Sequence, residues 1–172
     1  MVKGIKEIFS WGLTILIAII LALVIRTFIF EPVMVKQTSM YPTLNDSDKV
    51  IASKISYIIS DPQFQDIAVV QIDENNDYVK RVIGLPGDTV EIKNSKVYVN
   101  GEQIYEPYIS EDLVYDDYPL TTVPEGKYFV LGDNRPNSKD SRSAEIGFIP
   151  RENFKSKIVF RILPFSDFGK VE

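Results

Sequence analysis

The stretch TVEIKNSKVYVNGEQI, residues 89–104, decides the fold expected for this chain. Its Val, Ile and Tyr residues alternate with polar residues, which is the period of a half-buried β-strand. Two turn signals divide the stretch, Asn94-Ser95 and Asn100-Gly101. Asn-Gly suits a type I′ turn because both central residues of that turn need positive φ. The stretch is therefore predicted to form β-hairpins.

The same two-residue period recurs along the chain from Val33 onward. Turn signals such as Pro86-Gly87-Asp88 and Pro124-Glu125-Gly126 separate the runs, and no helix-length periodic segment follows Val33. We therefore expect an all-β domain of mostly antiparallel sheet. The other predicted strands lie within residues 66–72, 78–85, 127–133 and 156–162, and the acidic segment 110–119 is predicted to be a solvated loop.

One apolar segment precedes this domain. Residues 8–25, IFSWGLTILIAIILALVI, carry no charge. At about 1.5 Å per residue a helix of this length spans roughly 27 Å, close to the hydrocarbon thickness of a bilayer. A cleavable secretory signal is the competing interpretation, but the following RTFIFEPVMV is bulky where a cleavage site needs small residues. We predict a tail and transmembrane anchor over residues 1–30, in contact with membrane lipid, and a domain over residues 31–172.

The charges that flank the anchor give a weak indication of its orientation. Lys3 and Lys6 precede it, and Arg26 and Lys36 follow it. Positive residues favour the cytoplasmic side, and here the two ends are nearly balanced. We expect a single-pass protein of the cell membrane with a cytoplasmic amino terminus and an extracytoplasmic domain.

The composition excludes several kinds of chemistry. The 172 residues include no His and no Cys, and the formal net charge is −5. Ser-His-Asp and Cys-His hydrolysis are thereby excluded, and neither a metal site nor a cofactor is expected. The negative charge and the lack of a basic cluster argue against a nucleic-acid partner, because such proteins neutralise phosphates with clustered Lys and Arg.

A possible nucleophile lies in SMYPTL, residues 39–44, where a proline helps to form a turn. Activating Ser39 needs a base, and a lysine can serve when burial lowers its pKa from about 10.4. Lys80 lies inside the apolar run YVKRVIGL, on the strand face that it shares with Tyr78 and Val82. Taken alone, an exposed edge strand is the commoner setting for such a lysine, and SMYPTL is also compatible with a plain turn.

Three blocks of sequence decide between these interpretations. SMYPTL (39–44), KRVIGLPGD (80–88) and GDNRPNSKDSR (132–142) together resemble the bacterial type I signal peptidases, which are membrane-anchored serine proteases with a Ser-Lys dyad. The blocks stand in the order of that family, behind a single apolar segment. The resemblance implies a catalytic domain of the signal-peptidase type that removes signal peptides from secreted preproteins.

The resemblance also implies roles for individual residues. Ser39 would be the nucleophile that forms an acyl-enzyme, and Lys80 would be the general base. Ser138 matches a serine that hydrogen-bonds the lysine amine and orients it. Asp140 and Arg142 match an acid-base pair that holds the loop near the dyad. The other matched positions are Arg81 after the base, Met40 beside the nucleophile and in the pocket wall, and Asp133 in the Gly-Asp-Asn turn.

Two positions depart from the family pattern. Relatives commonly carry Ser or Gly two positions before the nucleophile, where this chain has Gln37. The backbone N–H of Ser39 can supply one oxyanion donor, and the Gln37 side-chain amide is a candidate for the second. Relatives also often have a glycine where Gln65 stands. Both differences bear on specificity more than on the dyad.

The substrate is expected to bind as an added strand. An extended signal peptide would pair with strand edges at residues 33–38 and 66–71. Shallow apolar pockets would then accept small residues at the first and third positions before the cut.

Three other functions compete with this interpretation. The main alternative is a non-catalytic, membrane-anchored accessory or assembly protein of the same fold, but such relatives typically lose the Ser or the Lys that this chain retains. A self-cleaving repressor-type protease shares the dyad but carries a DNA-binding segment in place of an apolar helix. A membrane-anchored β-domain that only binds a ligand would use SMYPTL as a turn.

Overall fold

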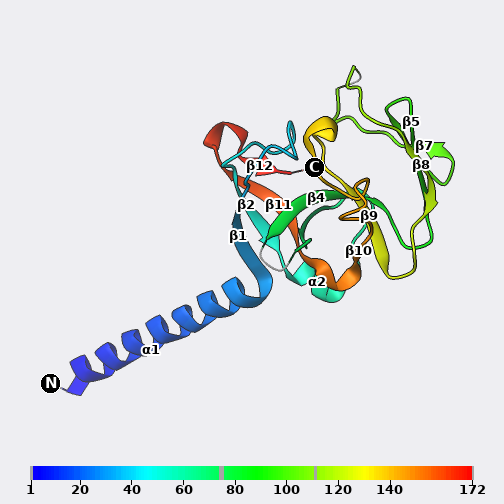
Figure 1. The fold of residues 1–172 in the computed structure, drawn as a ribbon. Helices are drawn as coiled ribbons and strands as arrows, with labels where there is room; N and C mark the ends of the chain where they lie inside the picture. The colour runs from blue at the N-terminus through cyan, green and yellow to red at the C-terminus, as the bar shows by residue number, and fades with distance from the viewer. Residues whose placement is uncertain (1, 74–75, 111, 172) are drawn as a thin grey trace.

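A long N-terminal helix projects from a β-rich body in the computed structural model, which describes residues 2–73, 76–110 and 112–171 (Figure 1). Helix α1 spans Val2–Val24 and continues as a π-helical turn over Ile25–Ile29. Residues Trp11–Ile29 form a stretch long and apolar enough to cross a membrane, and its side chains are not buried against the body. This arrangement is consistent with membrane anchoring.

The body contains an eight-stranded antiparallel sheet, counted over the described residues. Its strand order is β1-β2-β11-β3-β4-β9-β10, and β12 pairs with β11. The expectation of a mostly antiparallel β fold is confirmed. The strands are β1 (Phe30–Met34), β2 (Lys49–Ser53), β3 (Ile67–Gln71), β4 (Asp77–Gly84), β9 (Lys127–Leu131), β10 (Ile149–Pro150), β11 (Phe154–Leu163) and β12 (Gly169–Lys170).

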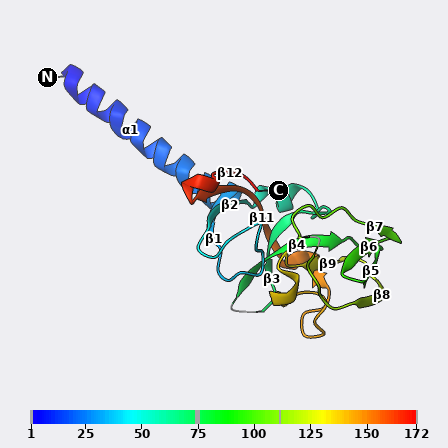
Figure 2. The ribbon, with the colours of Figure 1, turned by 90° about the horizontal axis from the view of Figure 1, so that it is seen from above.

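The hairpin stretch at residues 89–104 forms most of a second, four-stranded sheet. Its order is β7-β6-β5-β8, and the strands are β5 (Thr89–Lys93), β6 (Lys96–Val99), β7 (Glu102–Gln103) and β8 (Tyr118–Thr122). The turn residues Asn94, Ser95, Asn100 and Gly101 all have positive φ, at 50°, 57°, 54° and 82°. The predicted hairpins are therefore present. Figure 2 shows this sheet at the end of the body away from α1.

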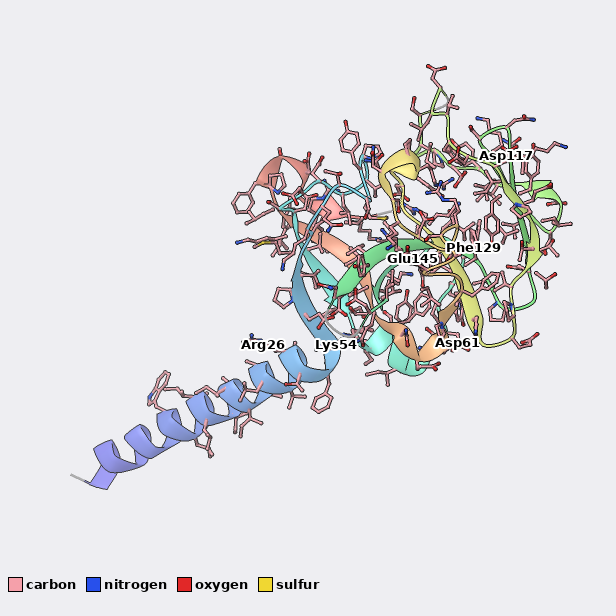
Figure 3. All side chains as sticks on the ribbon, in the orientation of Figure 1. Arg26, Lys54, Asp61, Asp117, Phe129 and Glu145 are labelled. Atoms are coloured by element: carbon pink, nitrogen blue, oxygen red, sulfur yellow. The ribbon has the colours of Figure 1, made fainter. Side chains whose placement is uncertain are left out.

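The two sheets share a core where β4 leads into β5. Phe129 of β9, labelled in Figure 3, is fully buried there with Val90 and Ile92 of the small sheet. Gly84 ends β4 at this junction, and a Cβ at that position would lie 2.7 Å from a methyl of Val90. The absence of a side chain thus lets the sheets approach closely.

The prediction of a solvated loop over residues 110–119 is wrong in part. Tyr115 is only 8% exposed, and Tyr118 begins β8. The two aromatic rings supply apolar surface to the core, while the neighbouring Asp116 and Asp117 remain exposed. The remaining short elements are α2 (Ile55–Ile59) and 3-10 turns at Arg135–Asn137, Arg151–Asn153 and Phe165–Asp167.

Candidate active site

Ser39 lies in the turn that leads from β1 to β2. Backbone bonds from Tyr41 N–H to the Thr38 carbonyl (3.1 Å) and from Leu44 N–H to the Met40 carbonyl (2.8 Å) give this turn a helical form. The side chains of Met40 and Leu44 are buried, at 1% and 0% exposure. Burial of these two apolar residues fixes the turn on the sheet and leaves Ser39 half-buried at its surface.

Lys80 reaches this serine from the middle of β4. Its Nζ lies 2.9 Å from Ser39 Oγ, and the residue is 1% exposed. The amine also lies 5.9 Å from the ring of Tyr78, on the strand face that alternation predicts. Burial lowers the pKa of Lys80 from 10.5 to about 8, although the carboxylates of Asp140 and Asp133 oppose the change. With this pKa, about a tenth of the Lys80 amine is neutral one pH unit lower, near neutral pH.

Arg81 is fully buried and forms a two-point ion pair with Asp133. Its Nε and Nη2 donate to the two carboxylate oxygens at 2.9 and 2.8 Å. The hydroxyl of Thr43 also donates to Asp133, at 2.5 Å. Arg81 and Asp133 thus join β4, the loop after β9 and the nucleophile turn.

The loop that follows β9 contacts the nucleophile turn directly. The backbone N–H of Asn134 donates to the Ser39 carbonyl, and its side-chain amide donates to the Thr38 carbonyl, both at 3.0 Å. Gly132 lies so close that a Cβ there would sit 2.5 Å from the Ser39 carbonyl oxygen and 2.2 Å from Ser138 Oγ. Only a glycine fits this approach without displacing the turn.

The predicted pair Asp140 and Arg142 holds this loop together. Arg142 Nε and Nη2 contact the Asp140 carboxylate at 2.8 and 2.9 Å. The same carboxylate accepts the Gly132 N–H at 3.0 Å, and Arg142 Nη2 donates to the Arg135 carbonyl at 2.6 Å. The ion pair therefore closes the loop from Gly132 to Arg142.

The structure does not contain the expected hydrogen bond between Ser138 and Lys80. The hydroxyl oxygen of Ser138 is buried, and it has no hydrogen-bond partner within the described part of the chain. It lies against Gly132, in the loop that contacts the turn of Ser39. The orienting role of Ser138 stays a prediction.

Gln37 adopts a left-handed backbone conformation, with φ of 73°. Its N–H donates to Asp46 Oδ1 at 2.7 Å, and its side chain is exposed. The backbone amide of Gln37 is thus already engaged. Among the described residues, the Ser39 N–H donates no hydrogen bond, and its role toward an oxyanion stays a prediction.

A cleft of about 450 Å³ opens beside the dyad. One wall is Val33–Gln37, the other is Asn76–Val79, and Ser39, Met40 and Val69 complete the lining. β1 pairs only with β2, and β4 pairs with β9 only from Arg81 onward. Within the described sheet, both walls therefore present backbone edges without a paired strand on the cleft side.

The prediction that residues 66–71 offer a free edge is wrong. β3 is interior, paired with β11 on one side and β4 on the other. Its residues Ile67–Val70 are buried on both faces, which is typical of a central strand. The free edge is at the start of β4. The sequence pattern did not indicate it, because Asn76 and Asp77 there are polar and were assigned to a turn.

Comparison with known proteins assigns this arrangement to a family. The model of the family described as signal peptidase, peptidase S26, matches residues 8–163. The chain belongs to this signal peptidase family. A signal peptidase I from Bacillus licheniformis is 41% identical over 97% of this chain and 95% of its own length, and signal peptidase IB from Staphylococcus aureus strain COL is 39% identical over 95% and 93%. A crystal structure of a signal peptidase I from Enterococcus faecalis V583 matches 58% of this chain and 97% of its own, with 36% identity and a TM-score of 0.48.

Membership of the signal peptidase family confirms that the chain is a serine endopeptidase of the S26 type. It supports removal of signal peptides from secreted preproteins, and it does not favour the alternative of a non-catalytic accessory protein. The family and the apolar N-terminal helix fit a membrane-anchored protein.

Sequence reasoning missed several residues of the signal peptidase site. Asn134 was part of a predicted turn, and Thr43 was part of a quoted motif, but neither was assigned a contact. Arg135 is 1% exposed and donates from Nε to the Gly132 carbonyl at 3.0 Å. Its position inside GDNRPNSKDSR was the only indication of Arg135, because both aspartates of that motif pair with other arginines and its own partner, Glu106, lies outside the motif.

Proposed function

We propose that this chain cleaves signal peptides with Ser39 as nucleophile and Lys80 as general base, through an acyl-enzyme. One observation carries the proposal, the distance of 2.9 Å between Lys80 Nζ and Ser39 Oγ at a lysine that is 1% exposed. Desolvation favours the neutral amine, and only the neutral amine can accept the proton of the serine hydroxyl.

The proposed acylation step breaks the scissile amide bond, forms one ester bond and moves one proton from Ser39 through Lys80 to the leaving amine. Neutral Lys80 takes the hydroxyl proton while Ser39 Oγ attacks the scissile carbonyl carbon. The backbone N–H of Ser39 donates to the oxyanion that develops. The Lys80 ammonium then gives its proton to the leaving amine of the mature protein, and the signal peptide stays bound as an ester of Ser39.

Deacylation repeats this proton transfer with water as the nucleophile. Lys80, neutral again, takes a proton from water, and the resulting hydroxide attacks the ester carbonyl. The proton returns to Ser39 Oγ as the carbon–oxygen bond breaks. The products are the free carboxyl end of the signal peptide and the regenerated serine.

The cleft supports binding of an extended peptide. Its two walls, Val33–Gln37 and Asn76–Val79, both carry backbone edges that a peptide strand can pair with. We propose that the signal peptide enters between them in extended form. Val33, Val69 and Val79 line the cleft with short apolar side chains, which suits small residues before the cut.

The proposed topology places the cleft next to the bilayer. Helix α1 spans the membrane with a cytoplasmic amino terminus, and the body lies outside. The turn with Ser39 follows β1, which itself begins directly after the apolar segment. This short connection keeps the dyad close to membrane-embedded substrates.

Cleavage of one secreted preprotein by the purified full chain, followed by mass spectrometry, tests the proposal. Ser39→Ala and Lys80→Met are expected to fold and to lose cleavage, whereas Lys93→Met, at an exposed lysine of β5, is the matched control and should cleave normally. A serine-directed lipopeptide or penem should label the wild type and leave Ser39→Ala unlabelled. A folded Lys80→Met protein that processes the preprotein at the normal rate would end the proposal.

A further inference from the structure

In the loop after β7, Glu106 contacts the buried Arg135 and Tyr108 contacts the buried Arg81; we call Glu106-Pro107-Tyr108 the EPY segment. The segment belongs to the long connection between β7 and β8, outside the three sequence blocks that resemble the family. Among the described residues, its side-chain bonds go to the arginines and within the segment, and none goes to Ser39 or Lys80. Any effect on the dyad must therefore be indirect.

Tyr108 covers Arg81. The centre of the tyrosine ring lies 3.7 Å from Arg81 Cζ, which is the geometry of a stacked guanidinium. The Nε–Nη2 edge of the same guanidinium makes the two-point pair with Asp133. Stacking therefore excludes water from that pair and restricts the orientation of the guanidinium.

Glu106 is the carboxylate partner of Arg135. Its Oε1 accepts a short bond from Arg135 Nη2, and the arginine side chain is 0% exposed against 11% for the glutamate. Tyr115 Oη lies 2.9 Å from Arg135 Nη1 and completes the cluster. Because Arg135 is buried, its charge needs this carboxylate.

The two contacts are themselves connected. The hydroxyl of Tyr108 donates to Glu106 Oε1 at 2.9 Å. One short segment thus contacts Arg135, which lies within the loop that begins at Gly132, and Arg81, which reaches that loop from β4. Arg135 holds the carbonyl of Gly132, and Arg81 holds the carboxylate of Asp133.

The held loop is the part that contacts the nucleophile turn. Gly132 packs against the Ser39 carbonyl, and Asn134 donates to the carbonyls of Ser39 and Thr38. A shift of either arginine would move these groups. Because the dyad works at a separation of 2.9 Å, a displacement of about 1 Å is expected to cost about 10²-fold in rate.

We propose that Glu106 and Tyr108 are positioning residues, which hold Ser39 in line with Lys80 through Arg135 and Arg81. This inference rests on the proposed function of the dyad. It extends that function to the EPY segment, which lies between β7 and β8 of the small sheet. It predicts that changes in the segment lower kcat and leave KM unchanged.

The test compares full-length variants in the preprotein cleavage assay, with kcat and KM measured separately and well below each variant's Tm. Glu106→Gln and Tyr108→Leu are expected to lower kcat by about 10²-fold with little change in KM. Tyr108→Phe keeps the ring on Arg81 and should recover most of the loss seen in Tyr108→Leu. Tyr105→Leu, at a tyrosine that is 81% exposed beside the segment, is the matched control and should match the wild type.

Unchanged kcat in folded Tyr108→Leu, or a change confined to KM, would overturn the inference. If Glu106→Gln does not fold, the kcat values of Tyr108→Leu and Tyr108→Phe test the inference. Equal kcat values in these two variants would then overturn it. Ser39→Ala and Lys80→Met run in parallel, because cleavage by either one would reject the dyad itself. If Ser39→Ala and Lys80→Met are inactive while the variants of the EPY segment are fully active, only the positioning role is rejected and the proposed dyad stands.

Discussion

The backbone N–H of Asn134 donates a 3.0 Å hydrogen bond to the carbonyl oxygen of Ser39. This bond joins the turn after β1 to the loop after β9, which are distant in sequence. The candidate nucleophile is thus positioned by its own turn and by a second loop that the buried arginines fix in place.

Replacing Gly132 by Ala should disrupt this contact. The new Cβ would lie 2.5 Å from the Ser39 carbonyl oxygen and 2.2 Å from Ser138 Oγ, so the turn must shift. We expect a stability loss of about 1–3 kcal/mol and a fall in kcat of about 10²-fold, measured by urea unfolding and preprotein cleavage. Gly169→Ala, which meets no atom within 4 Å, is the control, and wild-type activity in Gly132→Ala would refute the expectation.

The rate of cleavage should follow the ionisation of Lys80. Its pKa is lowered to about 8 by burial, so the neutral base accounts for about a tenth of the enzyme one pH unit below that value. We expect kcat/KM to rise about tenfold per pH unit up to a pKa near 8 and then to level off. A flat profile across this range, measured with enzyme that stays folded, would argue against Lys80 as the base.

Lys80→Met should stabilise the protein near neutral pH. The folded-state pKa of about 8 lies below the ordinary 10.5, so the cost of burying the charge is fully present below pH 8 and disappears as the pH rises through 10.5. At about 1.36 kcal/mol per unit of pKa the upper limit is roughly 3 kcal/mol. Urea unfolding at neutral and alkaline pH should show the advantage of Lys80→Met shrinking with pH, and a constant difference would contradict this account.

Gln37→Gly tests the second oxyanion donor. Glycine accepts the φ of 73° without the steric cost that glutamine incurs, so we expect a gain in stability of about 1 kcal/mol. The N–H bond to Asp46 is kept, because it comes from the backbone. We expect kcat to change little, since the Gln37 side chain is exposed, whereas a loss of about 10²-fold would assign oxyanion donation to that side chain.

Local patterns predicted much of the fold correctly. Alternation and Asn-Gly chemistry determine a hairpin within a few residues, and the turn angles at Asn100 and Gly101 match the prediction. The pattern gave no information on which strand lies beside which. For β3 it led to the wrong conclusion, because a run buried on both faces was taken for an open edge.

Some site residues could be predicted only as members of a motif. Arg81, Asp133, Asp140 and Arg142 were named from the sequence, and they form two ion pairs of the site, one buried and one partly buried. Their partners outside the motifs were not predictable. Glu106 contacts Arg135, and nothing in the local sequence of either residue specifies the other.

The sequence by itself determined the apolar helix, the hairpins and the absence of imidazole and thiol chemistry, because these depend on residue type and short-range spacing. Only the tertiary structure decided that the Lys80 side chain is buried and that its Nζ lies 2.9 Å from Ser39 Oγ. That distance follows from the order β1-β2-β11-β3-β4, in which β11, from near the end of the chain, lies between β2 and β3. Such long-range pairing depends on how all the apolar faces pack together. An alternating pattern shows which face of a strand is buried, but it does not show which strand pairs with it.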